Sequence, residues 1–406
     1  MSDIGSAIIR VHREEWARVV ATLARRIGDL GIAEEMAAEA FAVAVERWPD
    51  EGVPPNPGAW LTTTAHRKAI DRLRRESRRD ELHREALMRS DTPSPEPLGA
   101  IDDDRLRLVF TCCHPALAME TRIALTLRMV GGLTVAEIAR AFLVQETAMG
   151  QRITRAKAKI KAARIPYRVP SREDLPARVT GVLAVLYLIF NEGYLTSGPG
   201  TEAVRGDLTA EAVRLTRLVR ELLPGDGEVA GLLALMLLIE ARRTARVSAS
   251  GELVGLHEQD RGSWDRALIA EGHALVRARL ASGEAPGRYQ IMAAINAVHT
   301  DAPDVRDTCW NQVVALYDQL ARVDPSPIVR LNRAIALAEL DGPQVALAEI
   351  EALPLDGYHA FHATRADLLR RLGRGGEARD AYERAIALAG NTAERAHLAR
   401  RRDQLG

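Results

Sequence analysis

A helix-turn-helix pattern between residues 132 and 162 constrains this chain more than any other feature. Thr134 and Glu137 form a T-x-x-E capping box, which opens a short helix through Phe142. After a brief turn, a longer helix is predicted over residues 146–162. Its inward stripe consists of Met149, Ile153, Ala156 and Ile160. The opposite side is cationic and free to enter a nucleic-acid groove, although an ordinary helical hairpin has the same pattern.

The composition favours an all-α protein of two to three domains. The chain has 406 residues, of which 47% are hydrophobic and only 4% aromatic. Ala, Leu, Arg and Glu favour helices over strands. The three cysteines have no C-x-x-C spacing, which argues against a disulfide framework and a cysteine-rich zinc site. The longest apolar runs, Gly181–Phe190 and Val229–Ile239, are shorter than the ~20 residues that span a bilayer. A cytoplasmic protein without a membrane span is therefore expected.

The charge is balanced overall but unevenly distributed. There are 55 Lys and Arg residues against 55 Asp and Glu residues, yet residues 59–79 hold seven basic and two acidic side chains. Residues 151–168 hold seven basic side chains and no acidic one. The acidic, proline-bearing stretch 91–103 lies between them and is interpreted as a linker. Two basic modules suggest contact with a polyanion, although charge alone does not distinguish this from solvated helix faces.

The basic segment of the first module is predicted to be an amphipathic helix. Asn56 precedes Pro57, a favourable pair for an N-cap and a first turn. Apolar residues then recur every four positions at Leu61, Ala65, Ala69 and Leu73. The cationic residues fall on the outer face of this helix.

Beyond Pro170 the chain becomes neutral and rich in Ala and Leu, which predicts a helical C-terminal region. Residues near its end repeat at a spacing of 32: Ala334, Ala346, Ile350 and Leu353 are matched by Ala366, Ala378, Tyr382 and Ala385. This spacing is close to the ~34 residues of a tetratricopeptide repeat. Two copies are fewer than a free-standing solenoid needs, so upstream helices are expected to stack on them.

The first 168 residues resemble an extracytoplasmic-function (group IV) RNA polymerase sigma factor. The matching segments are IAEEMAAEAF (32–41), NPGAWLTTTAHRKAIDRLRR (56–75), GLTVAEIARAF (132–142) and QRITRAKAKI (151–160). The remainder, with VLAVLYLIFNEGY (182–194) and DRALIAEG (265–272), resembles the subgroup with a long C-terminal extension.

The resemblance implies four segments and two partners. They are a sigma-2-like domain (1–90), the acidic linker (91–103), a sigma-4-like helix-turn-helix domain (104–168) and a helical extension (169–406) with tetratricopeptide-like repeats near 325–392. The implied partners are promoter DNA and core RNA polymerase, through its β′ and β subunits. No catalytic residue, cofactor or metal is implied.

The resemblance also assigns roles to individual residues. Those implied to bind polymerase are Glu34, Glu35 and Glu39. Those implied to read and open the −10 element are Trp60, Thr63, Arg67, Lys68, Arg74 and Arg75. Those implied to read the −35 element are Thr147, Gln151, Arg152, Thr154, Arg155 and Lys159.

Several alternatives accompany this interpretation. A helix-turn-helix regulator with a tetratricopeptide-like sensor would not join polymerase, and a hydrolase carried by the extension lacks a nucleophile or metal motif. Cys112-Cys113-His114 and Asn191-Glu192-Gly193-Tyr194 are interpreted as structural, and His257, Glu258 and Asp260 as ion-pairing or capping residues. The extension is expected to contact the sigma modules and tune their activity in cis.

Overall fold

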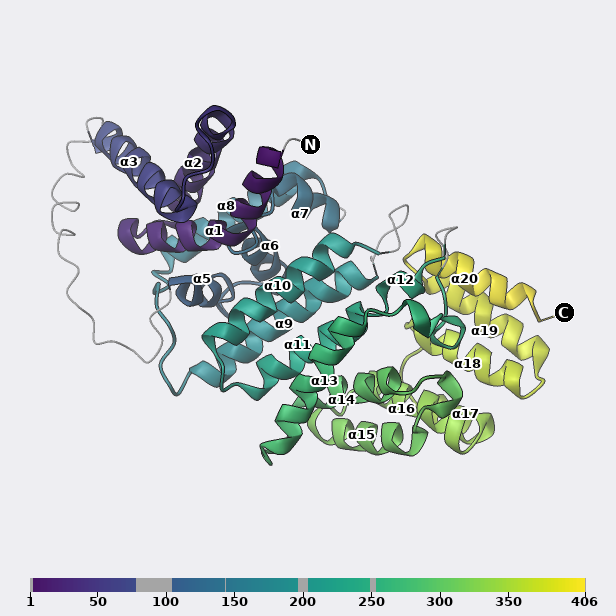
Figure 1. Ribbon diagram of the computed structural model, residues 1–406. Coiled ribbons are helices and arrows are strands. Elements are labelled where there is room, and N and C mark those ends of the chain that lie inside the picture. Colours follow the sequence, from purple (N-terminus) through teal and green to yellow (C-terminus); the bar gives the residue numbers. More distant parts are fainter. Residues whose placement is uncertain (1–2, 78–103, 143, 196–203, 249–252, 406) are drawn as a thin grey trace. The chain divides into compact units, whose positions relative to one another are not determined.

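The computed structural model describes residues 3–77, 104–142, 144–195, 204–248 and 253–405 (Figure 1). In these ranges the regular elements are helices, apart from an isolated bridge between Val247 and Leu253. The expectation of an all-α fold is confirmed. The chain forms two compact units, Met1–Leu188 and Ile189–Gly406.

The first unit begins with three packed helices: α1 (Asp3–Ile27), α2 (Leu30–Glu51) and α3 (Pro57–Ser77). The Asp29 carboxylate caps α2 by accepting hydrogen bonds from the Gly31 and Ile32 amides. The Asn56 side chain accepts from the Ala59 amide, as its predicted N-cap role requires. The apolar residues predicted for the inner face of α3 include Leu61, Ala65 and Ala69, all buried.

Four shorter helices complete most of this unit: α5 (Asp104–Cys112), α6 (Met119–Met129), α7 (Val135–Ala141) and α8 (Glu146–Ala162). The predicted capping box precedes α7, because the Thr134 amide donates to Glu137 and the Glu137 amide donates back to the Thr134 hydroxyl. The predicted inward stripe of α8 is buried throughout. The acidic stretch 91–103 lies outside the described residues.

The turn between α6 and α7 packs closely on α1. Gly132 has a φ of +75°, and a Cβ there would lie 2.8 Å from His12 Cε1 and 2.9 Å from Trp16 Cγ. The Trp16 indole N–H donates to the carbonyl oxygens of Arg128 (3.2 Å) and Met129 (3.1 Å). Only glycine satisfies both the backbone conformation and this approach. The helix-turn-helix is thus held against the first three helices.

The long helix α9 (Leu175–Tyr194) contains the boundary between the two units. Its residues 175–188 belong to the first unit, where Arg178 donates to the Phe110 carbonyl at 2.6 Å. This unit therefore continues 20 residues beyond position 168. By length and composition α9 could cross a membrane, which the shorter apolar runs in the sequence did not predict. Its apolar residues from Val179 to Phe190 are mostly buried, and a core helix can have the same composition.

The second unit is a succession of helices, most of which pack on their neighbours in the chain. They are α10 (Gly206–Leu222), α11 (Gly227–Glu240), α12 (Arg243–Arg246), α13 (Arg266–Ala281), α14 (Arg288–Asp301), α15 (Trp310–Val323), α16 (Pro327–Leu340), α17 (Pro343–Glu351), α18 (His359–Arg371), α19 (Gly375–Leu388) and α20 (Thr392–Asp403). Helix α11 is buried all round, from Val229 to Leu238. The neighbouring helices enclose it.

The eight residues that repeat at a spacing of 32 all lie in one buried cluster. The first copy falls on α16, α17 and the turn after α17, and the second on α18 and α19. Each copy is a helical hairpin, in which α16 packs on α17 and α18 packs on α19. The repeat in the sequence therefore corresponds to a repeat in the packing.

Candidate nucleic-acid and polymerase interface

The outward face of α8 carries the residues predicted to read DNA. Thr147, Gln151, Thr154, Arg155 and Lys159 are exposed, and Arg152 is half-buried. The Arg155 Nε donates to the Gln151 carbonyl at 3.3 Å, and the Lys159 ammonium donates to the Ala116 carbonyl at 2.6 Å. In the described part of the chain, no carboxylate forms an ion pair with Arg152 or Arg155. This face therefore offers donors and positive charge to a polyanion.

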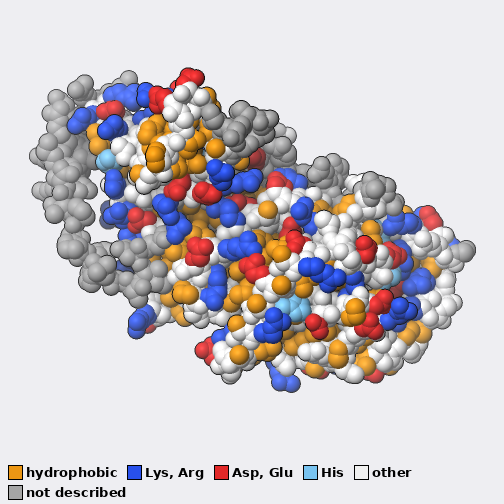
Figure 2. Space-filling model, viewed as in Figure 1, with side chains coloured by type: hydrophobic (Ala, Val, Ile, Leu, Met, Phe, Trp, Pro, Cys, Tyr) orange, Lys and Arg blue, Asp and Glu red, His pale blue; other side chains and the backbone are white. Residues whose placement is uncertain are grey.

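The outward face of α3 is also cationic but partly neutralised. Thr63, Arg67, Arg74 and Arg75 are exposed, and Figure 2 shows Lys and Arg side chains along the surface of α3. Lys68 forms an ion pair with Glu39 of α2 (2.9 Å), and Arg72 forms one with Glu35. Trp60 is half-buried and meets the buried Trp48 edge to face, with ring centroids 5.4 Å apart. One side of the indole is thus occupied by core packing.

The three acidic residues of α2 do not share one solvated face. Glu35 and Glu39 are exposed, whereas Glu34 is only 7% exposed. Glu34 accepts from the Arg128 guanidinium of α6 at 2.5–2.6 Å and pairs with Lys157 of α8. Successive helical residues lie about 100° apart, so Glu34 points toward α6 and α8 while Glu35 points toward α3. In this arrangement the Glu34 carboxylate is occupied inside the unit, and its contact with polymerase stays a prediction.

Further contacts tie the helix-turn-helix module to the first three helices. Asp29 pairs with Lys161 at 2.8 Å, and Arg25 pairs with Asp104 at 2.8 Å. The Tyr167 hydroxyl lies 3.0 Å from the Ala21 carbonyl oxygen, and burial raises the pKa of this phenol. Together with Glu34, these contacts connect the two modules through side chains far apart in the sequence.

The Cys112-Cys113-His114 segment lies in the interior of the first unit. Both thiols are buried, and the Cys113 sulfur lies 3.4 Å from the Thr126 hydroxyl. Burial raises the pKa of Cys112, and it raises that of Cys113 to about 11. Protonated, buried thiols are poor metal ligands, which supports a structural interpretation.

The segment from Asn191 to Tyr194 ends α9 in a tight contact with the start of α10. A Cβ at Gly193 would lie 2.6 Å from the Thr209 amide nitrogen, and the Gly193 carbonyl accepts from the Arg205 amide at 2.7 Å. The Tyr194 ring stacks on Phe190. These contacts account for glycine at position 193 as a packing requirement.

His257, Glu258 and Asp260, which were interpreted as ion-pairing or capping residues, make contacts of these kinds. Asp260 accepts from the Gly262 amide at 2.9 Å, and Glu258 lies 3.4 Å from the His257 imidazole. Glu258 also lies 3.7 Å from the Arg401 guanidinium. Each carboxylate therefore has a local partner.

Comparisons with protein families match three parts of the chain. Sigma-70 region 2 matches residues 13–79, which include most of α1 and all of α2 and α3 up to Ser77. Sigma-70, region 4 matches residues 107–160, which include the helix-turn-helix. A family of unknown function, DUF6596, matches residues 178–280. No solved structure matches the chain.

The relatives point to the same family. The chain is 33% identical to the ECF RNA polymerase sigma factor SigK of Mycobacterium ulcerans over 129 residues, which cover 30% of this chain and 67% of SigK. The chain belongs to the extracytoplasmic-function RNA polymerase sigma factors. It is 29% identical over 203 residues to the probable ECF sigma factor SigI of Mycobacterium tuberculosis, covering 47% of this chain and 68% of SigI. An uncharacterized protein of Rhizobium meliloti is 44% identical over 396 residues, covering 96% of this chain and 93% of that protein.

This sigma factor carries a C-terminal extension, and its two sigma-70 regions imply binding to core polymerase and promoter DNA. Arg128 and Lys157, which hold Glu34, were absent from the residues singled out in the sequence. Lys157 lies beside the predicted inward stripe of α8. This position was the one feature of the sequence that could have pointed to an inward contact of Lys157. Arg128 gave no signal, because its partner is 94 residues away.

Proposed function

We propose that this sigma factor reads the −35 element through α8 and the −10 element through α3, and carries no catalytic activity of its own. The observation that supports this most strongly is the two-sided character of α8. Four apolar residues anchor one side, while Gln151, Arg155 and Lys159 are exposed on the other. Arg and Gln side chains are suited to the acceptor and donor edges of guanine and adenine in the major groove. A cytoplasmic site of action follows from this role.

For the −10 element, we infer that different residues of α3 make different contacts with the DNA. Exposed Arg67, Arg74 and Arg75 would contact the phosphate backbone, and Thr63 lies on the same exposed side. Trp60 has one ring edge packed against Trp48, so it would stack with a flipped base only through its exposed part. Lys68 would join the DNA contact after releasing Glu39.

For polymerase, we infer that Glu35 and Glu39 dock on basic helices of the β′ subunit, and that the helix-turn-helix module meets the β subunit. Glu35 and Glu39 are exposed, and each pairs with a cation of α3. A basic partner would compete for these carboxylates and thereby free Arg72 and Lys68 for DNA. Glu34 would join the interface only if it left Arg128 and Lys157.

The extension is proposed to regulate the sigma modules in cis by contacting them. It is far longer than promoter reading requires, and stacked repeat helices offer surfaces that hold a peptide or a domain. The repeats near 325–392 are proposed to be of the tetratricopeptide type, since their equivalent residues share one buried cluster. A tether also raises the local concentration of such a domain to about the millimolar range.

Transcription in vitro with core polymerase tests the proposal, using the promoter region of the protein's own gene. The full chain should co-elute with core polymerase in gel filtration and start transcripts at a defined site. A helix-turn-helix regulator that acts without joining polymerase would bind the DNA but not co-elute. That result would overturn the proposal.

The regulatory part needs a truncation that preserves the first unit. A cut at residue 168 removes Arg178, which bonds the Phe110 carbonyl, so lost activity would have two explanations. A cut after Leu195 retains all of α9. If this truncated chain and the full chain initiate transcription equally well, the extension does not regulate in cis.

A further inference from the structure

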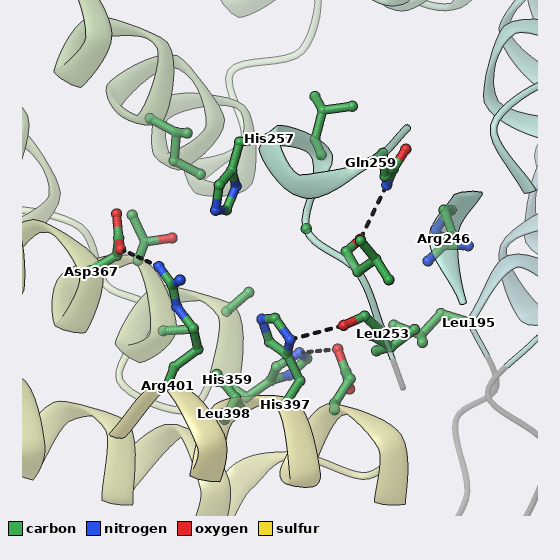
Figure 3. Close-up of a pocket in the computed structure, with 18 of the residues that line it drawn as sticks. Leu195, Arg246, Leu253, His257, Gln259, His359, Asp367, His397, Leu398 and Arg401 are labelled. Carbon is green, nitrogen blue, oxygen red and sulfur yellow. Dashed lines mark hydrogen bonds and ion pairs between the residues drawn. The ribbon is translucent and has the colours of Figure 1, made fainter. Parts of the chain in front are cut away.

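The second unit contains a cavity of about 480 Å³ among helices α12, α16, α18 and α20 and the loop at 253–259. Figure 3 shows Asp367 and Arg401 on one side of it and Arg246 on the opposite side, with His257 and His397 facing the space between. Its size is within the range of small-molecule sites. Nothing in the role of a sigma factor requires such a cavity.

The charges that line this cavity do not balance. It contains three carboxylates, of which two pair with an arginine of the cavity wall and one with a histidine, which is a cation only when protonated. Glu339 pairs with Arg371 at 2.6 Å, Asp367 with Arg401 at 3.1 Å and Glu394 with His359 at 3.1 Å. Two further arginines line it, Arg242 and Arg246, and neither forms an ion pair with any described residue. The cavity therefore has an excess of positive charge.

Both of these arginines are buried, with 8% of each residue exposed. The Arg246 guanidinium lies over the Tyr194 ring at 3.3 Å from its centroid, and its Nη1 donates to the Tyr194 carbonyl at 2.7 Å. Its remaining N–H donors have no protein acceptor in the described part of the chain. Arg242 donates to Asn296 at 3.1 Å, but its Nε is buried without a partner. Glu240 and Glu394 act on Arg246 electrostatically but form no ion pair with it. A buried cation without an ion-pair partner is costly, so the remaining Arg246 donors favour a ligand that supplies an anion.

The rest of the wall gives the ligand an apolar part. Leu253, Leu256, Leu368 and Leu398 line the cavity, and Ile335 is 42% exposed at its edge. A guanidinium recognises a carboxylate through two parallel hydrogen bonds. We propose that this cavity binds a small organic acid, with its carboxylate on Arg246 and its apolar body against Ile335 and the leucines. This proposal does not depend on the promoter-reading role.

Calorimetric titration of the full chain tests it with two matched pairs of probes. Hexanoate and hexanamide differ in charge but little in shape, as do benzoate and benzamide. At least one carboxylate should bind ten-fold or more tightly than its amide and raise the melting temperature. Arg246→Gln should weaken that binding at least ten-fold. Arg243→Gln is the matched control, because Arg243 is exposed on the same short helix and does not line the cavity.

Two further variants keep the test decisive if Arg246→Gln does not fold. Ala360→Leu narrows the cavity and Ile335→Ser removes exposed apolar surface, and both leave every charge in place. Each should weaken carboxylate binding several-fold without loss of folding. The proposal is overturned if neither carboxylate binds better than its amide, or if Ala360→Leu and Ile335→Ser bind as the wild type does.

Discussion

Buried charged side chains have different kinds of partners in the two units. In the first unit, the buried carboxylate Glu34 is matched by Arg128 and Lys157 from two other helices. In the second unit, Arg242, Arg246 and Arg261 form no ion pair with a described carboxylate. They donate to the Asn296 side chain or to backbone carbonyls, and carboxylates such as Glu394 and Asp304 act on Arg246 and Arg261 only at longer range. Arg261, for example, donates to the carbonyls of His299 and Ala302 and lies over the Trp264 ring.

This difference separates a buried charge that has ion-pair partners from buried charges that have none among the described residues. A buried ion pair with both partners present holds helices in one arrangement, and removal of one partner is strongly destabilising. Buried cations without an ion-pair partner are stable only at a cost that an anion would reduce. At Glu34 the first unit thus supplies both counter-charges, whereas Arg242 and Arg246 of the second unit leave room for an anion from outside.

The largest effect is expected from Glu34→Lys, which would break the matched group in the first unit. Three cations would then meet at a buried position, and we expect a loss of about 3–5 kcal/mol in the free energy of unfolding. Chemical denaturation of the full chain measures this, and hydrogen exchange in α8 should rise. Glu35→Lys is the neighbouring control, since Glu35 is exposed. Equal stability of the two variants would contradict the assigned role of Glu34.

The next largest effect is expected on the outward side of α8, where the charged side chains are exposed and not paired with a described carboxylate. Gln151→Ala and Arg155→Ala should each cost about 1–3 kcal/mol in −35 recognition, if each contacts a base. Transcription from promoters with an intact or a scrambled −35 element measures the loss of selectivity, and binding to core polymerase should stay unchanged. Arg330→Ala, which removes an exposed charge from α16, is the control. Unaltered selectivity in both variants would remove α8 from the −35 contact.

Local signals in the sequence predicted much of the fold. The capping box at Thr134 and Glu137 and the stripe from Met149 to Ile160 predicted the helix-turn-helix, because these interactions lie within a few residues of each other. The Asn56 cap is equally local, and the repeat at a spacing of 32 could be recognised because its pattern of small and apolar residues recurs. The fold class and the modules therefore needed little beyond helical periodicity.

The charged contacts could not be predicted in this way. Lys157 lies 123 residues from Glu34, and periodicity along one helix does not tell which other helix it meets. Arginines are usually exposed, so no pattern in the sequence predicted that Arg242 and Arg246 would lie in the interior. The cavity between α12 and the last helices depends on such long-range packing.

A smaller effect is expected from the pH dependence of the second unit. Burial, with Arg242 and Arg261 nearby, lowers the pKa of His299 to about 4. The unfolded chain would then bind a proton between pH of about 6.5 and 4 that the folded chain does not, so stability should fall as the pH falls through this window. His299→Phe should reduce this loss by about 1–2 kcal/mol at pH of about 5. Denaturation of both proteins at several pH values measures it, and parallel curves would argue against a neutral His299.

The smallest change in stability, under about 1 kcal/mol, is expected from Glu35→Lys combined with Glu39→Lys, because exposed ion pairs contribute little. These residues lie on the same helix as Glu34 but pair with α3 at the surface. If they dock on polymerase, the double variant should bind core polymerase several-fold more weakly, and the difference should shrink at high salt. Glu46→Lys combined with Glu51→Lys makes the same change in charge at exposed sites nearer the end of α2. Equal weakening by the two double variants would mean that overall charge, and not this pair of carboxylates, governs assembly.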